Sequence, residues 1–98
     1  MPQNYFKNRD EDSRWPSRLD IGDIVLIIEK DKQGSRDIND LIKGTIIRKL
    51  SKSDRYENGA KVEVILHPDD WRYKTLGAQT FIGRVQYTLE HRSGAKVQ

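Results

Sequence analysis

The chain has 98 residues and a formal net charge of +3; 35% of the residues are hydrophobic, 34% are charged and none is cysteine. A chain of this length forms one domain with a small core, which excludes two independent cores and argues against a large internal enzyme cavity. Without cysteine, the protein has neither disulfides nor thiolate metal ligands.

The sequence predicts neither a membrane-spanning nor a secretory segment. Its longest apolar run, residues 24–28, is far shorter than the ~20 residues that a membrane-spanning helix needs. Residues 1–20 lack the apolar stretch of a secretory signal. We therefore expect a cytoplasmic protein with no membrane partner.

The two ends of the chain are predicted to be flexible tails. Residues 1–18 alternate charged side chains with Asn, Ser and Pro and show no hydrophobic period, so they cannot bury enough surface to offset the entropy of ordering. One aromatic side chain, such as Trp15, is expected to pin this tail against the domain. The globular domain is predicted over residues 19–90, and residues 91–98 form the second tail.

Two strands are predicted in the first half of the domain. Residues 24–28 are all apolar, as expected for a strand that is covered on both faces. Residues 44–50 form the second strand. Between them, residues 37–43 are predicted to form one short helical turn whose apolar side chains, Ile38 among them, point inward; a turn of this length is not stable alone.

Two more strands are predicted in the second half. In residues 61–66, Val62, Val64 and Leu66 alternate with Lys61, Glu63 and Ile65, and the run follows Asn58-Gly59, a typical turn sequence. Residues 79–89 form the fourth strand, in which Gly83 indicates a bulge or bend. Short strands without a long amphipathic helix predict an all-β fold, a small SH3-like barrel of four to five antiparallel strands, with an OB-fold as the alternative.

A set of short glycine-based motifs between residues 19 and 87 resembles the YwbE-like family of small bacterial proteins. The matching positions are Gly22, Val25, Lys30, Asp31, Gly44, Leu50, Ser53, Gly59, Lys61, Val62 and the run Gly83-Arg84-Val85-Gln86. The chain departs from the family pattern in a longer first loop, 31–44, and in an insertion at 67–81. The function of the family is not established, so the resemblance implies mainly a fold: a compact barrel related to KOW-type modules, which often contact RNA or ribosomal partners.

No pattern of catalytic or metal-binding residues is visible in the sequence. Asp69 and Asp70 are adjacent, and neighbours on an extended chain point in opposite directions, so we assign them to a solvated loop. The two histidines, His67 and His91, lack the spacing of known metal sites and are assigned to the surface. We predict that the protein is not an enzyme and has no cofactor or metal.

Basic side chains interleaved with aromatic ones favour a binding function. Residues 44–66 hold five basic and three acidic side chains, and residues 67–98 also hold five and three. One candidate patch lies on a predicted strand–turn–strand unit. It consists of Arg48, Lys49, Lys52, Arg55, Tyr56 and Lys61. The inserted loop and the last strand add Arg72, Tyr73, Lys74 and Arg84.

These residues predict contact with RNA or DNA, because lysine and arginine neutralise phosphates while aromatic rings stack on bases. One alternative is a protein-interaction module that uses the exposed aromatic side chains of the 67–81 loop, Trp71 and Tyr73. Another alternative is that these basic side chains are merely solvated and serve only the solubility of a highly charged chain. The sequence carries no signal for the oligomeric state.

Overall fold

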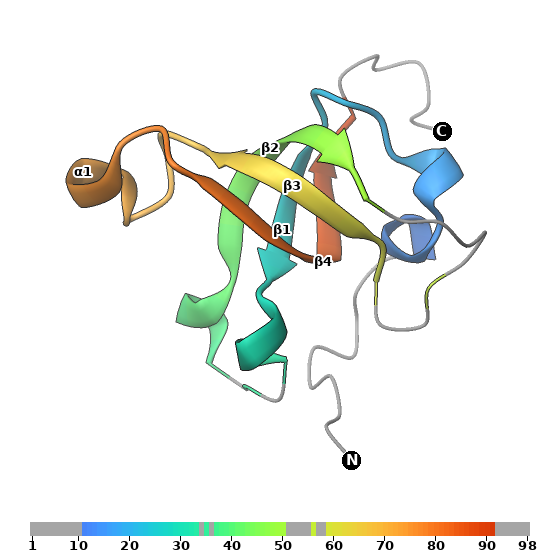
Figure 1. The fold of residues 1–98 in the computed structure, drawn as a ribbon, viewed down its shortest axis with the longest axis horizontal. Coiled ribbons are helices and arrows are strands. Elements are labelled where there is room, and N and C mark those ends of the chain that lie inside the picture. Colours follow the sequence, from blue (N-terminus) through green and yellow to red (C-terminus); the bar gives the residue numbers. More distant parts are fainter. Residues whose placement is uncertain (1–10, 34, 36, 51–55, 57–58, 92–98) are drawn as a thin grey trace.

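The structure, a computed structural model, describes residues 11–33, 35, 37–50, 56 and 59–91. Its strands are β1 (Ile24–Ile28), β2 (Ile42–Lys49), β3 (Lys61–Leu66) and β4 (Thr80–Glu90) (Figure 1). Its helical segments are short: η1 (Glu11–Arg14), η2 (Pro16–Arg18), η3 (Lys30–Lys32), η4 (Ile38–Asp40) and α1 (Tyr73–Leu76). Within the described residues, none of these helices is long and apolar enough to span a bilayer.

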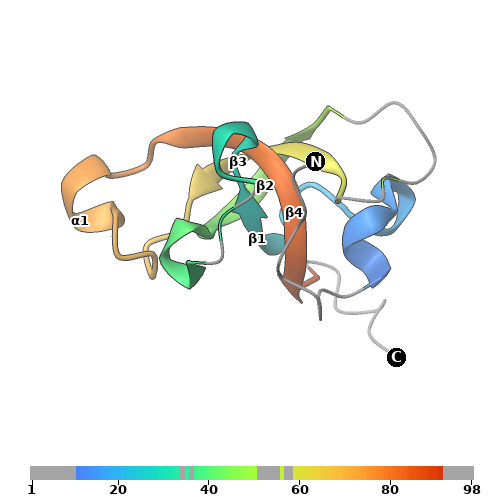
Figure 2. The same ribbon diagram turned by 90° about the horizontal axis from the view of Figure 1, so that it is seen from below.

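The four strands form a closed antiparallel sheet in the order β1-β2-β3-β4. The ring of strands closes because β4 is long enough to pair with two other strands. Its first half, Thr80–Arg84, pairs with β3, and its second half, from Arg84 to Glu90, pairs with β1. Figure 2 shows the curve that this strand follows along the molecule. The predicted antiparallel all-β fold is thereby confirmed, and β3 has the predicted bounds.

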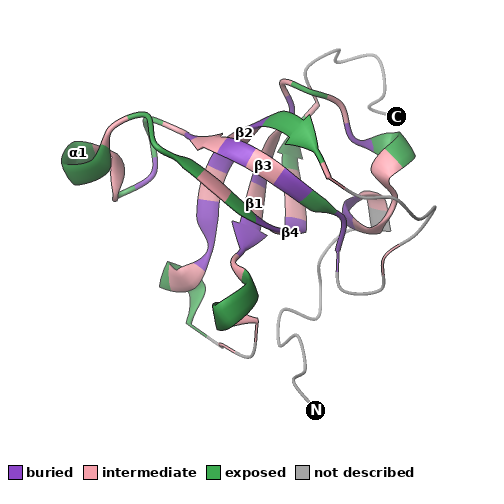
Figure 3. Cartoon of the chain, in the orientation of Figure 1, coloured by how far each residue is buried: buried purple, intermediate pink, exposed green. Residues whose placement is uncertain are grey.

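The core lies inside the ring of strands, where the alternation of side chains places it (Figure 3). In β3, three valine and leucine side chains are buried, while Lys61, Glu63 and Ile65 alternate with them on the outer face. In β1, residues 25, 27 and 28 are buried and residues 24 and 26 are partly covered. The buried cluster comprises Leu19, Val25, Ile27, Ile42, Ile46, Ala60, Val62, Val64, Leu66 and Val85.

Gly83 does not form the bulge that the sequence predicts. It pairs regularly with Val62, and the register of β4 against β1 shifts instead at two other places, between Val85 and Tyr87 and between Thr88 and Glu90. The glycine is required for another reason: a Cβ atom at position 83 would lie 2.5 Å from the carbonyl oxygen of Ile28. Gly83 is therefore needed for a close backbone contact that the sequence did not predict, and the register irregularities of β4 lie elsewhere in the strand.

The described part of the predicted N-terminal tail packs against the sheet. Residues 11–19 contain η1 and η2, and Ser13 and Leu19 are fully buried. The backbone N–H of Ala60 donates to the carbonyl oxygen of Ser13 at 2.8 Å, and that of Tyr56 donates to Arg14 at 2.8 Å. Residues 1–10 and 92–98, the rest of the two predicted tails, lie outside the described residues.

The predicted helical turn at 37–43 is shorter than expected. Only η4 is helical, and the Asp37 carboxylate caps it by accepting from the N–H of Asn39 at 2.9 Å. Ile38 does not point inward, because 71% of its surface is exposed. Leu41 and Ile42 are buried as predicted, but they enter the sheet as extended chain, since β2 begins two residues earlier than the sequence indicates.

Candidate functional site

A groove of about 540 Å³ opens on the outer face of the sheet, between η3 and the strands β3 and β4. Three cations, one carboxylate and one exposed apolar side chain line most of it: Lys30, Lys61, Arg84, Asp31 and Ile82. The apolar side chain, Ile82, is 44% exposed. The groove therefore combines a net positive charge with an apolar surface.

The strand register brings these cations together. Lys61, the first residue of β3, pairs directly with Arg84 of β4, and Arg84 also pairs with Ile28 at the end of β1. Because chain neighbours such as Val62 and Val85 point into the core, the side chains of Lys61 and Arg84 lie on the outer face. Lys30 follows β1 by two residues and completes the set.

An aromatic ring lies beside the groove. The guanidinium carbon of Arg84 is 5.2 Å from the centre of the Tyr56 ring, within the range of a cation–π contact. The same guanidinium donates from Nη1 to the carbonyl oxygen of Gly59 at 3.3 Å. Tyr56 is half-buried, so part of its surface remains accessible. The site thus presents a flat arginine–tyrosine pair next to a concave basic surface.

The structure divides the basic patch predicted on the strand–turn–strand unit. Tyr56 and Lys61 lie near Arg84, whereas Arg48 forms an ion pair with Glu63, with 2.8 Å between Nη2 and Oε1. Lys49 has a structural role: its Nζ donates to the carbonyl oxygen of Leu19 at 2.9 Å and to that of Pro16 at 3.2 Å. Lys52 and Arg55 lie outside the described residues.

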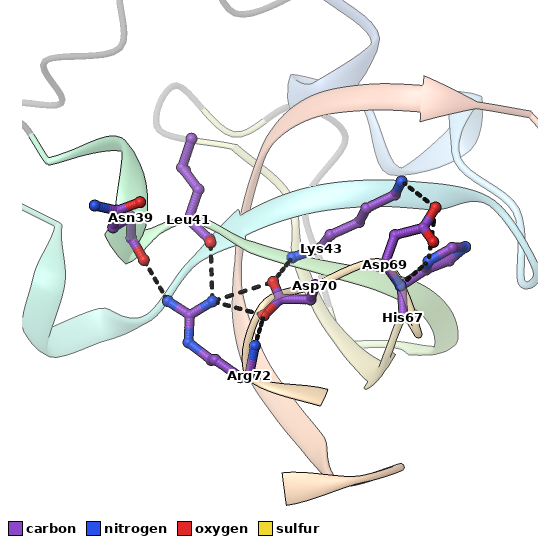
Figure 4. Close-up of polar contacts among 7 residues, drawn as sticks. All are labelled: Asn39, Leu41, Lys43, His67, Asp69, Asp70 and Arg72. Carbon is purple, nitrogen blue, oxygen red and sulfur yellow. Dashed lines mark hydrogen bonds and ion pairs between the residues drawn. The ribbon is translucent and has the colours of Figure 1, made fainter. Parts of the chain in front are cut away.

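The second predicted patch, around α1, lies at another end of the molecule and contains a buried ion pair (Figure 1). The Asp70 side chain is 3% exposed and that of Arg72 is 14% exposed, with 3.0 Å between Oδ1 and Nη1. The guanidinium of Arg72 also donates to the carbonyl oxygens of Leu41, at 3.2 Å, and Asn39 (Figure 4). The Asp70 carboxylate accepts the backbone N–H of Lys43 at 2.9 Å.

This ion pair changes the interpretation of several predicted residues. Asp70 is not the solvated side chain that the sequence suggests, whereas the Asp69 side chain is 71% exposed. Arg72 holds the first loop against α1 and has little surface left for a ligand, and Tyr73 packs against the core. Of the three residues predicted here, only Lys74 belongs to the exposed surface.

Sequence reasoning missed two residues, Lys30 and His91. Lys30 was matched only as one of the short motif positions, with no binding role, and the closure of the sheet places it on the groove that Lys61 also lines. His91, assigned to the surface, has only 11% of its side chain exposed and lies between the carboxylates of Asp12 and Asp23. Among the described residues, no three His, Asp or Glu side chains are grouped as ligands for one metal ion.

Comparisons with known proteins add no family assignment. No protein-family model, curated protein or solved structure matches this chain.

Proposed function

We propose that the protein is a cytoplasmic, non-catalytic module that binds RNA or DNA through the groove between η3, β3 and β4. The observation that carries this proposal is the convergence of Lys30, Lys61 and Arg84 on one groove. We further propose that the closed sheet is of the SH3-like, KOW-type class and that the chain is YwbE-like, on the motifs between residues 19 and 87.

The chemistry of the groove suits a nucleic-acid strand better than a neutral ligand. Lysine and arginine side chains release counterions when they contact phosphates, and this release supplies most of the sequence-independent affinity. The Tyr56 ring and the Arg84 guanidinium offer flat surfaces on which bases stack. Among the described residues that line the groove, Asp31 is the one carboxylate, and the three cations outnumber it.

Replacing Lys61 by alanine tests this proposal. We expect fluorescence anisotropy with short single-stranded RNA and DNA to show binding that weakens as salt rises. The log–log slope should become less steep, less negative by roughly 0.7, in Lys61→Ala, the value for one lost phosphate contact on a single strand. All oligomer sequences should be weakened about equally, because phosphate contacts position the strand without reading its bases.

Lys74→Ala is the matched control, because it removes the same charge from an exposed lysine of α1 that does not line the groove. We expect its salt slope to equal that of the wild type. Equal effects of Lys61→Ala and Lys74→Ala would show that binding is diffuse and is not located in the groove. Absence of binding at low salt, where the electrostatic contribution is greatest, would refute the nucleic-acid proposal.

Trp71 supports a second candidate function, that of a protein-interaction module. Its side chain is an exposed anchor, with 66% of the residue's surface accessible. The ring lies 4.4 Å from the guanidinium carbon of Arg72, which is itself held by Asp70. A large aromatic side chain that is already ordered loses little entropy on binding, and this is a property of interface hot spots.

The two candidates differ in their response to nuclease and to the Trp71→Ala substitution. If the 67–81 loop binds a protein, affinity capture from lysate should retain that partner after nuclease treatment, and Trp71→Ala should lose it. The expected cost of this truncation is about 2 kcal/mol or more for a hot-spot tryptophan. A partner that Trp71→Ala retains in full would contradict this second function.

A further inference from the structure

One carboxylate lies among the cations of the proposed binding groove. Asp31, in η3, is exposed and lines the groove together with Lys30, Lys61 and Arg84. Within the described part of the chain, Asp31 forms no ion pair with these cations. A carboxylate repels phosphates, so it weakens the contacts that the cations make with a nucleic-acid backbone. Any favourable contribution of Asp31 to binding must therefore involve another part of the nucleotide.

The groove has the size and the surfaces that a single base requires. Its volume of about 540 Å³ falls within the range of small-molecule sites, roughly 300–1,000 Å³. Ile82 of β4 is exposed at the groove and offers an apolar surface to the flat face of a base. Proteins recognise single-stranded nucleic acids by holding an unstacked base at both its face and its edge. The groove can therefore hold a base while the cations contact its phosphates.

The chemistry of a carboxylate selects among the bases. An ionised carboxylate has two acceptor oxygens and no donor, so a bidentate contact requires two adjacent N–H groups. Guanine presents such a pair on its Watson–Crick edge, namely the ring N–H and the neighbouring amino group. In adenine and cytosine the amino group adjoins a ring nitrogen with a lone pair, and in uracil and thymine the N–H lies between two carbonyl groups. Both arrangements would place an acceptor against a carboxylate oxygen.

A second polar side chain suits the rest of the guanine edge. Gln33 lies two residues after Asp31, is half-buried and also lines the groove. Its side-chain amide carries two N–H donors. The carbonyl oxygen of guanine, which adjoins the ring N–H, is an acceptor for such a donor. One turn of chain after β1 thus supplies both an acceptor group and a donor group to the groove.

We infer that the groove binds one unpaired guanine base of a nucleic-acid strand and that Asp31 determines this preference. The inference rests on the proposed function. The Asp31 carboxylate accepts the ring N–H and the amino group, the Gln33 amide donates to the carbonyl oxygen, and Ile82 lies against the face of the base. The three cations contact phosphates and set the affinity for every sequence, whereas Asp31 sets the difference between sequences.

The test measures the affinity of the full chain for short oligouridines that carry one central guanosine, inosine, adenosine or cytidine, by fluorescence anisotropy at low salt. Inosine retains the ring N–H and the carbonyl oxygen of guanosine and lacks only the amino group. We expect the wild type to bind the guanosine oligomer about five- to tenfold more tightly than the adenosine or cytidine oligomer. This is the lower part of the range for a bidentate contact, because Asp31 is exposed. The inosine oligomer should fall between them.

Asp31→Asn is the informative variant, because an amide replaces one acceptor by a donor at nearly the same size. We expect its affinity ratios of guanosine to inosine and of guanosine to adenosine to approach one. Its affinity for the adenosine and cytidine oligomers should rise, since a charge that repels phosphates is removed. Asp69→Asn is the matched control, because it removes the same charge from an exposed side chain in the loop before α1. It should keep the wild-type ratios.

The outcomes separate this inference from the proposed function. Equal affinity for all four oligomers, or a guanosine preference that Asp31→Asn retains, would overturn the inference and leave the proposed function intact. A preference that Asp69→Asn also loses would show a general effect of charge and would overturn the inference in the same way. Absence of binding to every oligomer would overturn the proposed function, and the inference with it.

Discussion

Replacing Gly59 by alanine is expected to lower the free energy of unfolding by about 3 kcal/mol or more, the upper range for single substitutions. Two effects add at this position. Gly59 has a φ of 101°, which an L side chain adopts only with strain, and an added Cβ would overlap the carbonyl oxygen of Val85 in β4. Urea denaturation followed by circular dichroism measures the change.

Gly77→Ala distinguishes the cost of backbone strain from the cost of steric overlap by the added Cβ. Gly77 also has a positive φ, 65°, but an added Cβ there meets nothing within 4 Å. Its substitution should therefore cost only the backbone strain, about 1–3 kcal/mol, and less than Gly59→Ala. An unchanged unfolding midpoint for Gly59→Ala would show that the chain near residue 59 does not have the described conformation.

Removing the Asp70 carboxylate should have the second large effect. We expect Asp70→Ala to destabilise the protein by about 3–5 kcal/mol, the range for losing one partner of a buried ion pair. The substitution leaves the Arg72 guanidinium, whose side chain is 14% exposed, without its counter-charge. It also leaves the backbone N–H of Lys43 without its acceptor. The same denaturation experiment measures the loss.

Asp69→Ala is the matched control for this experiment. The two aspartates are adjacent in the chain, but the Asp69 side chain is 71% exposed and its ion pair with Lys43 spans 3.3 Å at the surface. Exposed pairs of this kind contribute little, so the expected change is within about 0.5–1 kcal/mol. Similar losses for both variants would mean that Asp70 is not buried against Arg72.

The strands were predictable because the sequence patterns that define them lie within a few consecutive residues. Alternation along residues 61–66 is enough to define β3, since each side chain reports which face of the sheet it occupies. The unbroken run of apolar residues at 24–28 is a second local signal, typical of a strand that is covered on both faces, and it defines β1. The positive φ of Gly59 also agrees with the turn signal at that position.

The functional groove was only partly predictable, because contacts between distant residues decide what each cation does. Nothing in the sequence around Lys49 shows that its Nζ binds the carbonyl oxygen of Leu19, 30 residues earlier. Arg72 likewise binds the carbonyl oxygen of Leu41, 31 residues earlier. A count of basic residues assigns every lysine and arginine to a ligand surface, whereas the fold uses some of them to hold its own loops.

The closure of the sheet determines how any partner can attach. Each of the four strands pairs with two others, because β4 returns to β1, and each half of β4 pairs with a different one of its two partners. An open sheet exposes unpaired N–H and C=O groups at its edges, and extended peptides dock there by adding a strand. In this chain the backbone N–H and C=O groups form hydrogen bonds within the sheet wherever two strands are paired. Where a strand is paired on both sides, as β1 is along Ile24–Ile27, recognition must therefore come from side chains and loops, and strand addition has no template there.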